Sequence, residues 1–74
     1  MNDPKVVDTV IADLPKMATA KEVADALRVE PPTISRWVRA GALRGMRVGS
    51  RTLRVRKEDL REFLLGADEM NLTE

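Results

Sequence analysis

The spacing of the apolar residues changes twice along this chain, and each change predicts a change of secondary structure. From Ala20 to Val38 the apolar residues recur three and four positions apart, as they do on one face of a helix. From Met46 to Val55 they alternate with polar residues, a pattern typical of strands. From Leu60 the helical spacing returns. We therefore expect a mainly α-helical fold with a small β-hairpin.

Two short helices with a brief turn between them are predicted first. Thr19 and Glu22 have the spacing of a capping box, so a helix begins directly after Thr19. The Pro31-Pro32 pair suits the first turn of a second helix, where backbone donors have no helical acceptor. Gly41 is placed to end that helix. Two helices joined by a turn of three or four residues form a helix-turn-helix.

The second helix has two faces of opposite character. At roughly 100° per residue, Ile34, Trp37 and Val38 fall on one apolar face. We expect Trp37 to pack in the core, although stacking on a base is the alternative. The opposite face points towards solvent or a ligand and carries Pro32, Ser35, Arg36 and Arg39.

A β-hairpin is predicted around the Gly49-Ser50 pair. Met46 and Val48 precede the pair, and Leu53 and Val55 follow it. A two-stranded hairpin is marginal alone, so we expect these four apolar side chains to pack together on the helices. The other face of the hairpin is then basic, with Arg47 and Arg54.

A helix is predicted at each end of this unit. Asp3 is suited to cap an N-terminal helix with Pro4 in its first turn, and Pro15 is placed to stop it. At the other end, the spacing of the apolar residues indicates a core helix from about Lys57 to Gly66, with an apolar face of Leu60, Phe63 and Leu64.

The composition excludes several kinds of chemistry. The 74 residues include neither cysteine nor histidine, so thiol and imidazole chemistry and most zinc or iron sites are excluded. The carboxylates form no evident paired site. We therefore expect one domain that is not an enzyme and needs no metal or cofactor. No signal peptide or membrane-spanning run is present, so the expected location is the cytoplasm.

The net charge of +1 hides a basic centre. Residues 31–57 hold eight basic residues and no acid, whereas residues 1–30 have a net charge of −2 and residues 58–74 of −5. A basic block inside an otherwise acidic small domain is the electrostatic footprint expected of nucleic-acid binding.

The residues resemble one family with the order helix, turn, basic helix, hairpin, helix. The segments Ala20–Ala24, Thr33–Gly41, Arg47–Gly49 and Glu58–Leu64 look like those of the excisionase-type, MerR-like winged helix-turn-helix domains. This resemblance covers about residues 17–65 and implies binding to duplex DNA. The chain departs from the family where it has Arg28 and Glu30 in the turn, and the interval from Val48 to Leu60 is one residue longer than expected.

The resemblance and the charge pattern together predict the domain organisation and the site. Residues 1–16 are an N-terminal helix and connector, 17–66 a winged helix-turn-helix DNA-binding domain, and 67–74 an acidic, partly disordered tail. The first residues of the second helix reach base edges in such domains. The predicted DNA-binding residues are Pro32, Thr33, Ser35, Arg36, Arg39, Arg44, Arg47, Arg51 and Arg54, with base contacts from Pro32, Thr33 and Arg36.

Several roles stay open at this point. Arg44 contacts either phosphate or solvent, and Arg56 and Lys57 either flank the last helix or bind phosphate. Met46 is expected to pack on the core, with insertion between bases as the minor alternative. The acidic tail either solubilises the protein or contacts the basic face of a neighbouring copy.

Three functions are compatible with this sequence. The leading expectation is an excisionase of a phage or mobile element, which acts in the bacterial host near the nucleoid. It binds DNA cooperatively with neighbouring copies, bends it and directs an integrase towards excision. The second is a small transcriptional regulator. Only nine residues follow Leu65, too few for the dimerising helix and effector domain of full MerR-type activators, so no small-molecule effector is expected. The third is a protein-interaction adaptor.

Overall fold

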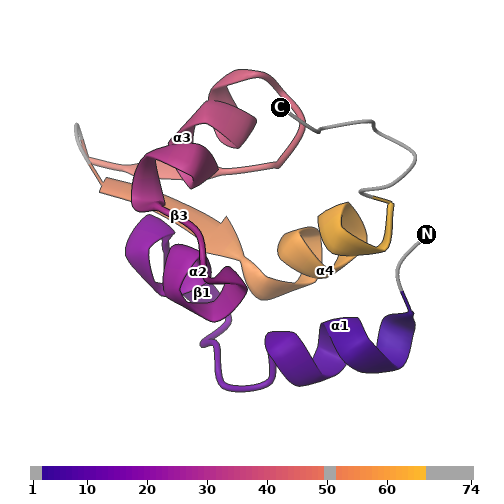
Figure 1. Ribbon diagram of the computed structural model, residues 1–74. Helices are drawn as coiled ribbons and strands as arrows, with labels where there is room; N and C mark the ends of the chain where they lie inside the picture. Colours follow the sequence, from indigo (N-terminus) through magenta and orange to yellow (C-terminus); the bar gives the residue numbers. More distant parts are fainter. Residues whose placement is uncertain (1–2, 50–51, 67–74) are drawn as a thin grey trace.

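In the residues that the structure describes, four helices and one three-stranded antiparallel sheet make up the fold (Figure 1). The computed structural model describes residues 3–49 and 52–66, so Arg51 and the predicted tail, residues 67–74, lie outside the described residues. The elements are α1 (Pro4–Val10), β1 (Met17–Thr19), α2 (Ala20–Leu27), α3 (Pro31–Arg39), β2 (Met46–Val48), β3 (Thr52–Arg56) and α4 (Lys57–Leu65). None of the helices in this part of the chain is long and apolar enough to cross a membrane.

The predicted capping box starts α2. The Thr19 hydroxyl accepts from the backbone N–H of Glu22 at 2.9 Å, and the Glu22 carboxylate accepts from the backbone N–H of Thr19 at 2.8 Å. These reciprocal bonds satisfy two donors that have no partner within the helix. After Leu27, residues 28–30 connect α2 to α3, and the two helices pack against each other. The predicted helix-turn-helix is therefore confirmed.

The end of α3 is also as predicted. Gly41 has φ = 82°, a left-handed conformation that glycine adopts without steric cost. Its N–H donates to the carbonyl of Val38 at 3.0 Å, and the N–H of Ala42 donates to the carbonyl of Trp37 at 3.0 Å. This pattern satisfies helix carbonyls that would otherwise lack partners.

The N-terminal helix forms but is shorter than predicted. The Asp3 carboxylate accepts from the N–H of Lys5 at 2.9 Å, which confirms the predicted cap. The helix ends at Val10 rather than near Pro15. The N–H groups of Ala12 and Leu14 donate to carbonyls only three residues back, so tight turns replace the helix while Ile11 stays buried.

The strand β1 was not predicted. Its three residues pair antiparallel with β3, so that Ala18 lies opposite Val55 and both side chains are fully buried. A run of three residues is too short to show a period of two, so its strand structure comes from pairing with β3. The sheet order is β1-β3-β2, which leaves β2 at an edge.

The predicted packing of the hairpin is wrong for β2. Met46 and Val48 are 48% and 49% exposed, whereas Val55 is fully buried. Met46 pairs with Arg54, and Val48 pairs with Thr52, so positions 49–51 separate the paired strand ends. A two-residue turn would pair Val48 with position 51. The additional residue moves the β2 side chains to the opposite face of the hairpin, because strand side chains alternate.

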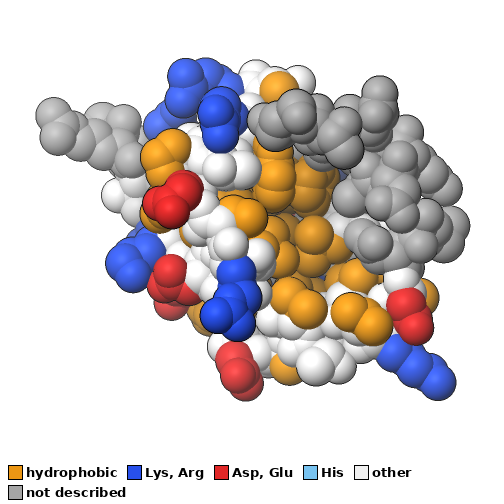
Figure 2. Space-filling view, in the orientation of Figure 1, with side chains coloured by type: hydrophobic (Ala, Val, Ile, Leu, Met, Phe, Trp, Pro, Cys, Tyr) orange, Lys and Arg blue, Asp and Glu red, His pale blue; other side chains and the backbone are white. Residues whose placement is uncertain are grey.

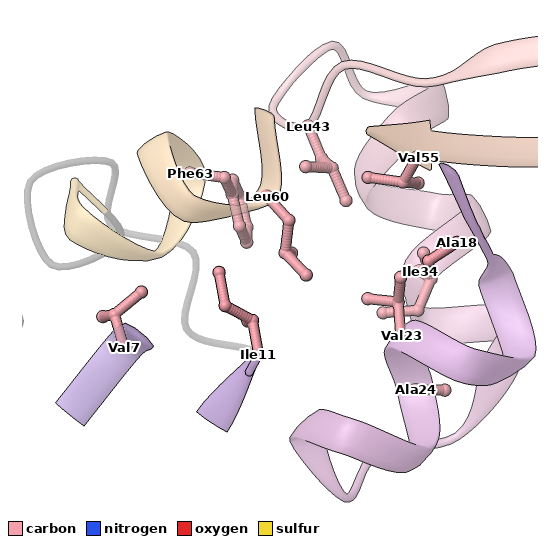
Figure 3. Packing of buried hydrophobic residues seen from close by; sticks show 10 residues of the cluster. All are labelled: Val7, Ile11, Ala18, Val23, Ala24, Ile34, Leu43, Val55, Leu60 and Phe63. Carbon is pink, nitrogen blue, oxygen red and sulfur yellow. The ribbon is translucent and has the colours of Figure 1, made fainter. Parts of the chain in front are cut away.

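One hydrophobic core contains residues from the N-terminal segment, the sheet, the helix-turn-helix and α4 (Figure 3). Val7 of α1 and Ile11, the residue directly after α1, point towards Leu60 and Phe63 of α4. The other buried residues come from β1, α2, α3, β3 and the segment after α3; they are Ala18, Val23, Ala24, Ile34, Leu43 and Val55. The N-terminal helix thus contributes to the same core as the helix-turn-helix.

Candidate nucleic-acid interface

The exposed face of α3 carries most of the predicted base-reading and backbone-contacting residues. Pro32, Arg36 and Arg39 are exposed, and Thr33 and Ser35 are half-buried at the edges of this face. The opposite side of the helix is anchored by Ile34, which is fully buried. The structure therefore brings these five predicted residues together on one helix face.

The orientation of α3 about its axis is fixed by an aromatic contact. The ring centroids of Trp37 and Phe63 are 5.1 Å apart with an interplanar angle of 40°, a tilted arrangement that is favourable for two aromatic rings. Trp37 is packed against the core, as predicted. A rotation of α3 by one residue would break this contact and withdraw Ile34 from the core.

The N-terminus of α3 begins without a side-chain cap. Glu30 occupies the capping position but makes no capping hydrogen bond, and the two prolines occupy the first positions of the helix. Because proline has no backbone N–H, two donors that a cap would otherwise satisfy do not exist. The N–H of Thr33 donates to the carbonyl of Glu30 at 2.9 Å. The N-terminus of α3 is therefore ordered by the two prolines and this backbone bond, and the Glu30 carboxylate does not cap it.

One hydrogen bond orients the Arg36 side chain. Its Nη2 atom donates to the Thr33 hydroxyl at 3.2 Å, one helical turn earlier. The guanidinium carries five N–H donors, so the others remain available for a ligand. A guanidinium held on an exposed helix face can donate two parallel hydrogen bonds to one acceptor pair.

The arginines of the hairpin lie on its two opposite faces. Arg47 pairs with Leu53, and directly paired residues project to the same side of a sheet. Leu53 in turn lies close to Gly45 and near the Val38 side chain of α3. Arg54 pairs with Met46 and projects to the other side. The expectation that Arg47 and Arg54 share one basic face is therefore wrong, for the same reason of register.

A second basic cluster lies on the Arg54 side of the hairpin. Arg44 and Arg54 line a hollow of about 220 Å³ together with Gly45, Met46, Arg56 and Asp59. Arg44 is exposed and Arg54 is half-buried. The spacing along the sequence did not predict this grouping, because it depends on the length of the loop between the strands.

Arg56 and Lys57 are engaged within the protein. The guanidinium of Arg56 donates two hydrogen bonds to Asp59, at 2.8 and 3.1 Å. This contact holds the pKa of Asp59 below its ordinary value of 3.8 and raises the pKa of Arg56. The Nζ atom of Lys57 donates to the carbonyl of Ala12 at 3.1 Å. Of the two roles open for these residues, the structure favours that of flanking and anchoring α4.

The turn between α2 and α3 adds a basic residue that the predicted site lacked. Arg28 is exposed and lies three positions before Pro31. The acid-free stretch begins only after Glu30, so the charge count by segment did not include it. Its place in the sequence, three residues before the predicted start of the second helix, is the feature that would have indicated it.

Comparison with known proteins agrees with this geometry. A family of helix-turn-helix domains matches residues 19–67, well over half of the chain. Searches of curated proteins and of solved structures gave no match. Helix-turn-helix domains bind DNA with their second helix in the major groove, so the match implies DNA binding. The chain belongs to the helix-turn-helix domain family.

Proposed function

We propose that this protein binds duplex DNA sequence-specifically and acts there without catalysing a reaction. The observation that carries the proposal is the exposed face of α3, with Arg36 and Arg39 on a helix whose other face is locked into the core. The segment between positions 31 and 57 contains eight basic residues and no acid. Apart from Arg56 and Lys57, which are engaged within the protein, these residues supply the attraction for phosphate.

The base-reading part of the interface is the first half of α3. Arg36 donates two hydrogen bonds to a guanine, the commonest specific contact, and Thr33 and Pro32 contact neighbouring base edges. Ser35 and Arg39 contact the backbone. The β2–β3 hairpin serves as the wing of a winged helix-turn-helix, in which Arg47 and Arg51 contact phosphate or a narrow minor groove. Arg44 and Arg54 supply further phosphate contacts from the other side of the hairpin.

The biological role that we propose is that of an excisionase of a phage or mobile element. Several copies bind side by side near an attachment site in the bacterial cytoplasm, bend the DNA and direct an integrase towards excision. Bending a site costs on the order of 1–6 kcal/mol, which the small interface of a single 74-residue chain supplies with difficulty. Cooperative copies share that cost, so the proposal requires clustered binding sites. The resemblance of the Thr33–Gly41 and Arg47–Gly49 segments to excisionase-type domains supports it.

A nuclease footprint tests this role directly. The purified protein is bound to the DNA surrounding its own gene, including any integrase gene and attachment site. We expect protection of repeated sites beside the attachment core. Protection confined to a promoter would instead support a transcriptional regulator. No protection at low salt with folded protein would contradict DNA binding and leave the protein-interaction adaptor.

A further inference from the structure

The four large hydrophobic side chains that are exposed in the described residues fall into two pairs. Val6 and Val10 lie one turn apart on α1 and are 58% and 39% exposed. Met46 and Val48 lie on one face of β2 and are 48% and 49% exposed. Single exposed hydrophobic residues are ordinary, but a contiguous exposed patch marks an interaction site.

The pair on α1 borders an apolar groove. The groove has a volume of about 380 Å³ and lies where α1 meets α2 and α4. Figure 2 shows hydrophobic side chains gathered at the centre of this face of the molecule. One acidic residue stands at the rim, and the lining residues are Asp3, Val6, Val7, Val10, Leu27 and Leu64.

The pair on β2 belongs to an apolar surface with basic neighbours. β2 is an edge strand, and its two hydrophobic side chains project away from the face that carries Leu53 and Val55. Arg54 lies directly opposite Met46 on this outward face. Arg47 projects to the other face, so a contact through Met46 and Val48 leaves Arg47 available to DNA. In a copy whose hairpin is docked, Arg54 faces the neighbouring copy instead of phosphate, and it contacts phosphate only in a copy without such a neighbour.

These two surfaces are complementary in charge. The groove is concave and apolar with the acidic Asp3 at its rim, whereas the hairpin face is apolar with the basic Arg54 beside it. Pairing two grooves would bring Asp3 towards Asp3, and pairing two hairpins would bring Arg54 towards Arg54. Like charges in a desolvated contact are unfavourable, so each surface favours the other over itself.

We propose that the outward hairpin face of one copy docks in the α1–α2–α4 groove of the next copy on DNA. This inference rests on the proposed DNA binding. The contact is heterologous, so it adds copies in one direction along the duplex and does not close into a symmetric dimer. Two pairs of half-exposed side chains cover much less than the roughly 1,200 Å² that stable interfaces bury. The chain is therefore a monomer in solution, and the contact forms when neighbouring DNA sites raise the local concentration to about millimolar.

Cysteine cross-linking tests the direction of this contact, because the natural chain has no cysteine. A duplex bound by the wild type is first selected from a random library. Duplexes with one copy of that site, or with two tandem copies at a series of spacings, are then prepared. The variants Val6→Cys and Val48→Cys are bound alone or mixed and treated with a short bis-maleimide. We expect at least five times more cross-linked dimer from the mixture than from either variant alone, and only on the tandem duplex.

Two matched variants complete the experiment. Lys5→Cys places the thiol on a different side of α1 and should give little cross-linking with Val48→Cys. Val6→Lys places a cation in the groove and should reduce cooperativity between tandem sites at least tenfold while the single-site Kd stays the same. Circular dichroism confirms that each variant is folded.

The possible failures are distinguishable. Cross-linking between two Val6→Cys copies would show a symmetric contact and overturn the proposal. Normal single-site binding without cross-linking on any tandem spacing would also overturn it, as would equal yields from Lys5→Cys. If another segment of the same chain occupied the groove, single-site binding would be normal and no cross-linking would occur, so this arrangement would also overturn the proposal. Failure of the wild type to bind any selected duplex would instead refute DNA binding itself.

Discussion

If the proposed function is right, Arg36 is the residue on which sequence specificity depends most. Its guanidinium is exposed on α3 and is oriented by the hydrogen bond to Thr33. We expect Arg36→Ala to weaken binding to a selected duplex by about 1–3 kcal/mol and to relax the preference at one base pair. A competition assay with duplexes substituted at each position measures both effects. Lys5→Ala removes the same charge from α1 and should leave the preference intact; equal effects of the two variants would refute the role of Arg36.

The backbone conformation of Arg28 is unfavourable for a residue with a side chain. It ends α2 in the left-handed region, with φ = 61° and ψ = 44°, and it is the one non-glycine residue with positive φ in the described part of the chain. A side chain in this region costs about 1–2 kcal/mol, part of which is offset by the greater entropy that glycine loses on folding. We expect Arg28→Gly to raise the free energy of unfolding by about 0.5–1 kcal/mol. Urea denaturation measures this change. Arg28→Ala removes the charge but keeps the β-carbon, so equal stabilisation by both variants would attribute the effect to charge.

The contact between α3 and the hairpin depends on one glycine. A β-carbon at Gly45 would lie 2.9 Å from Val38 Cγ1 and 3.1 Å from Leu53 Cδ1. Val38 is β-branched and has little freedom to move aside. We expect Gly45→Ala to destabilise the protein by about 1–3 kcal/mol, in the range of overpacking. Thermal or urea unfolding measures this loss. At Gly49 a β-carbon would meet nothing within 4 Å. Gly49→Ala therefore adds no clash, only the strain of a side chain at positive φ, about 1–2 kcal/mol. A Gly45→Ala variant as stable as the wild type would contradict steric crowding at Gly45.

The junction of β3 and α4 predicts a dependence of stability on pH. The hydrogen bonds from Arg56 hold the pKa of Asp59 below its ordinary value of 3.8. A carboxyl group with a lowered pKa in the folded state stabilises the fold above its unfolded pKa and loses that effect as the pH falls. Asp59→Asn should therefore be less stable than the wild type at pH 7, and the difference should shrink below about pH 4. Denaturation at pH 7 and pH 3 measures both differences. A difference that is the same at both pH values would contradict this account.

The helices and strands differ in how well the residues within each one predict its conformation. The capping box of α2, the proline start of α3 and its glycine end are local signals within a few residues, and each was predicted correctly. The faces of β2 were predicted wrongly because they depend on the register across three loop positions, which alternation within one strand does not reveal. The strand β1 owes its conformation to pairing with β3, about 37 residues away in sequence.

The candidate site shows the same division. The phase of α3 follows from its own apolar spacing, so the exposure of Pro32, Arg36 and Arg39 was predictable. The placement of Arg47 and Arg54 on opposite faces of the hairpin was not predictable, because it follows from the register of the two strands. The engagement of Arg56 with Asp59 also depended on how β3 leads into α4.

At the scale of the whole molecule, charge and hydrophobic surface are both distributed unevenly. The basic residues are concentrated in α3, the hairpin and the segment between them, while the N-terminal 30 residues have a net charge of −2. The N-terminal helix and the residue after it add Val7 and Ile11 to the core, although both lie outside the matched residues 19–67. We thus assign the basic face to phosphate, and the α1–α2–α4 groove and the outward hairpin face to a neighbouring copy.

The central claim is that α3 and the hairpin bind the DNA backbone, and the salt dependence of duplex binding tests it most directly. With about five phosphate contacts, log K should fall against log salt concentration with a slope of about −4 to −5. The double variant Arg39→Ala, Arg47→Ala should reduce the magnitude of the slope by about 2. The double variant Lys5→Ala, Lys21→Ala removes the same charge elsewhere and should leave the slope unchanged. A slope near zero for the wild type, or the same slope after loss of Arg39 and Arg47, would contradict the account.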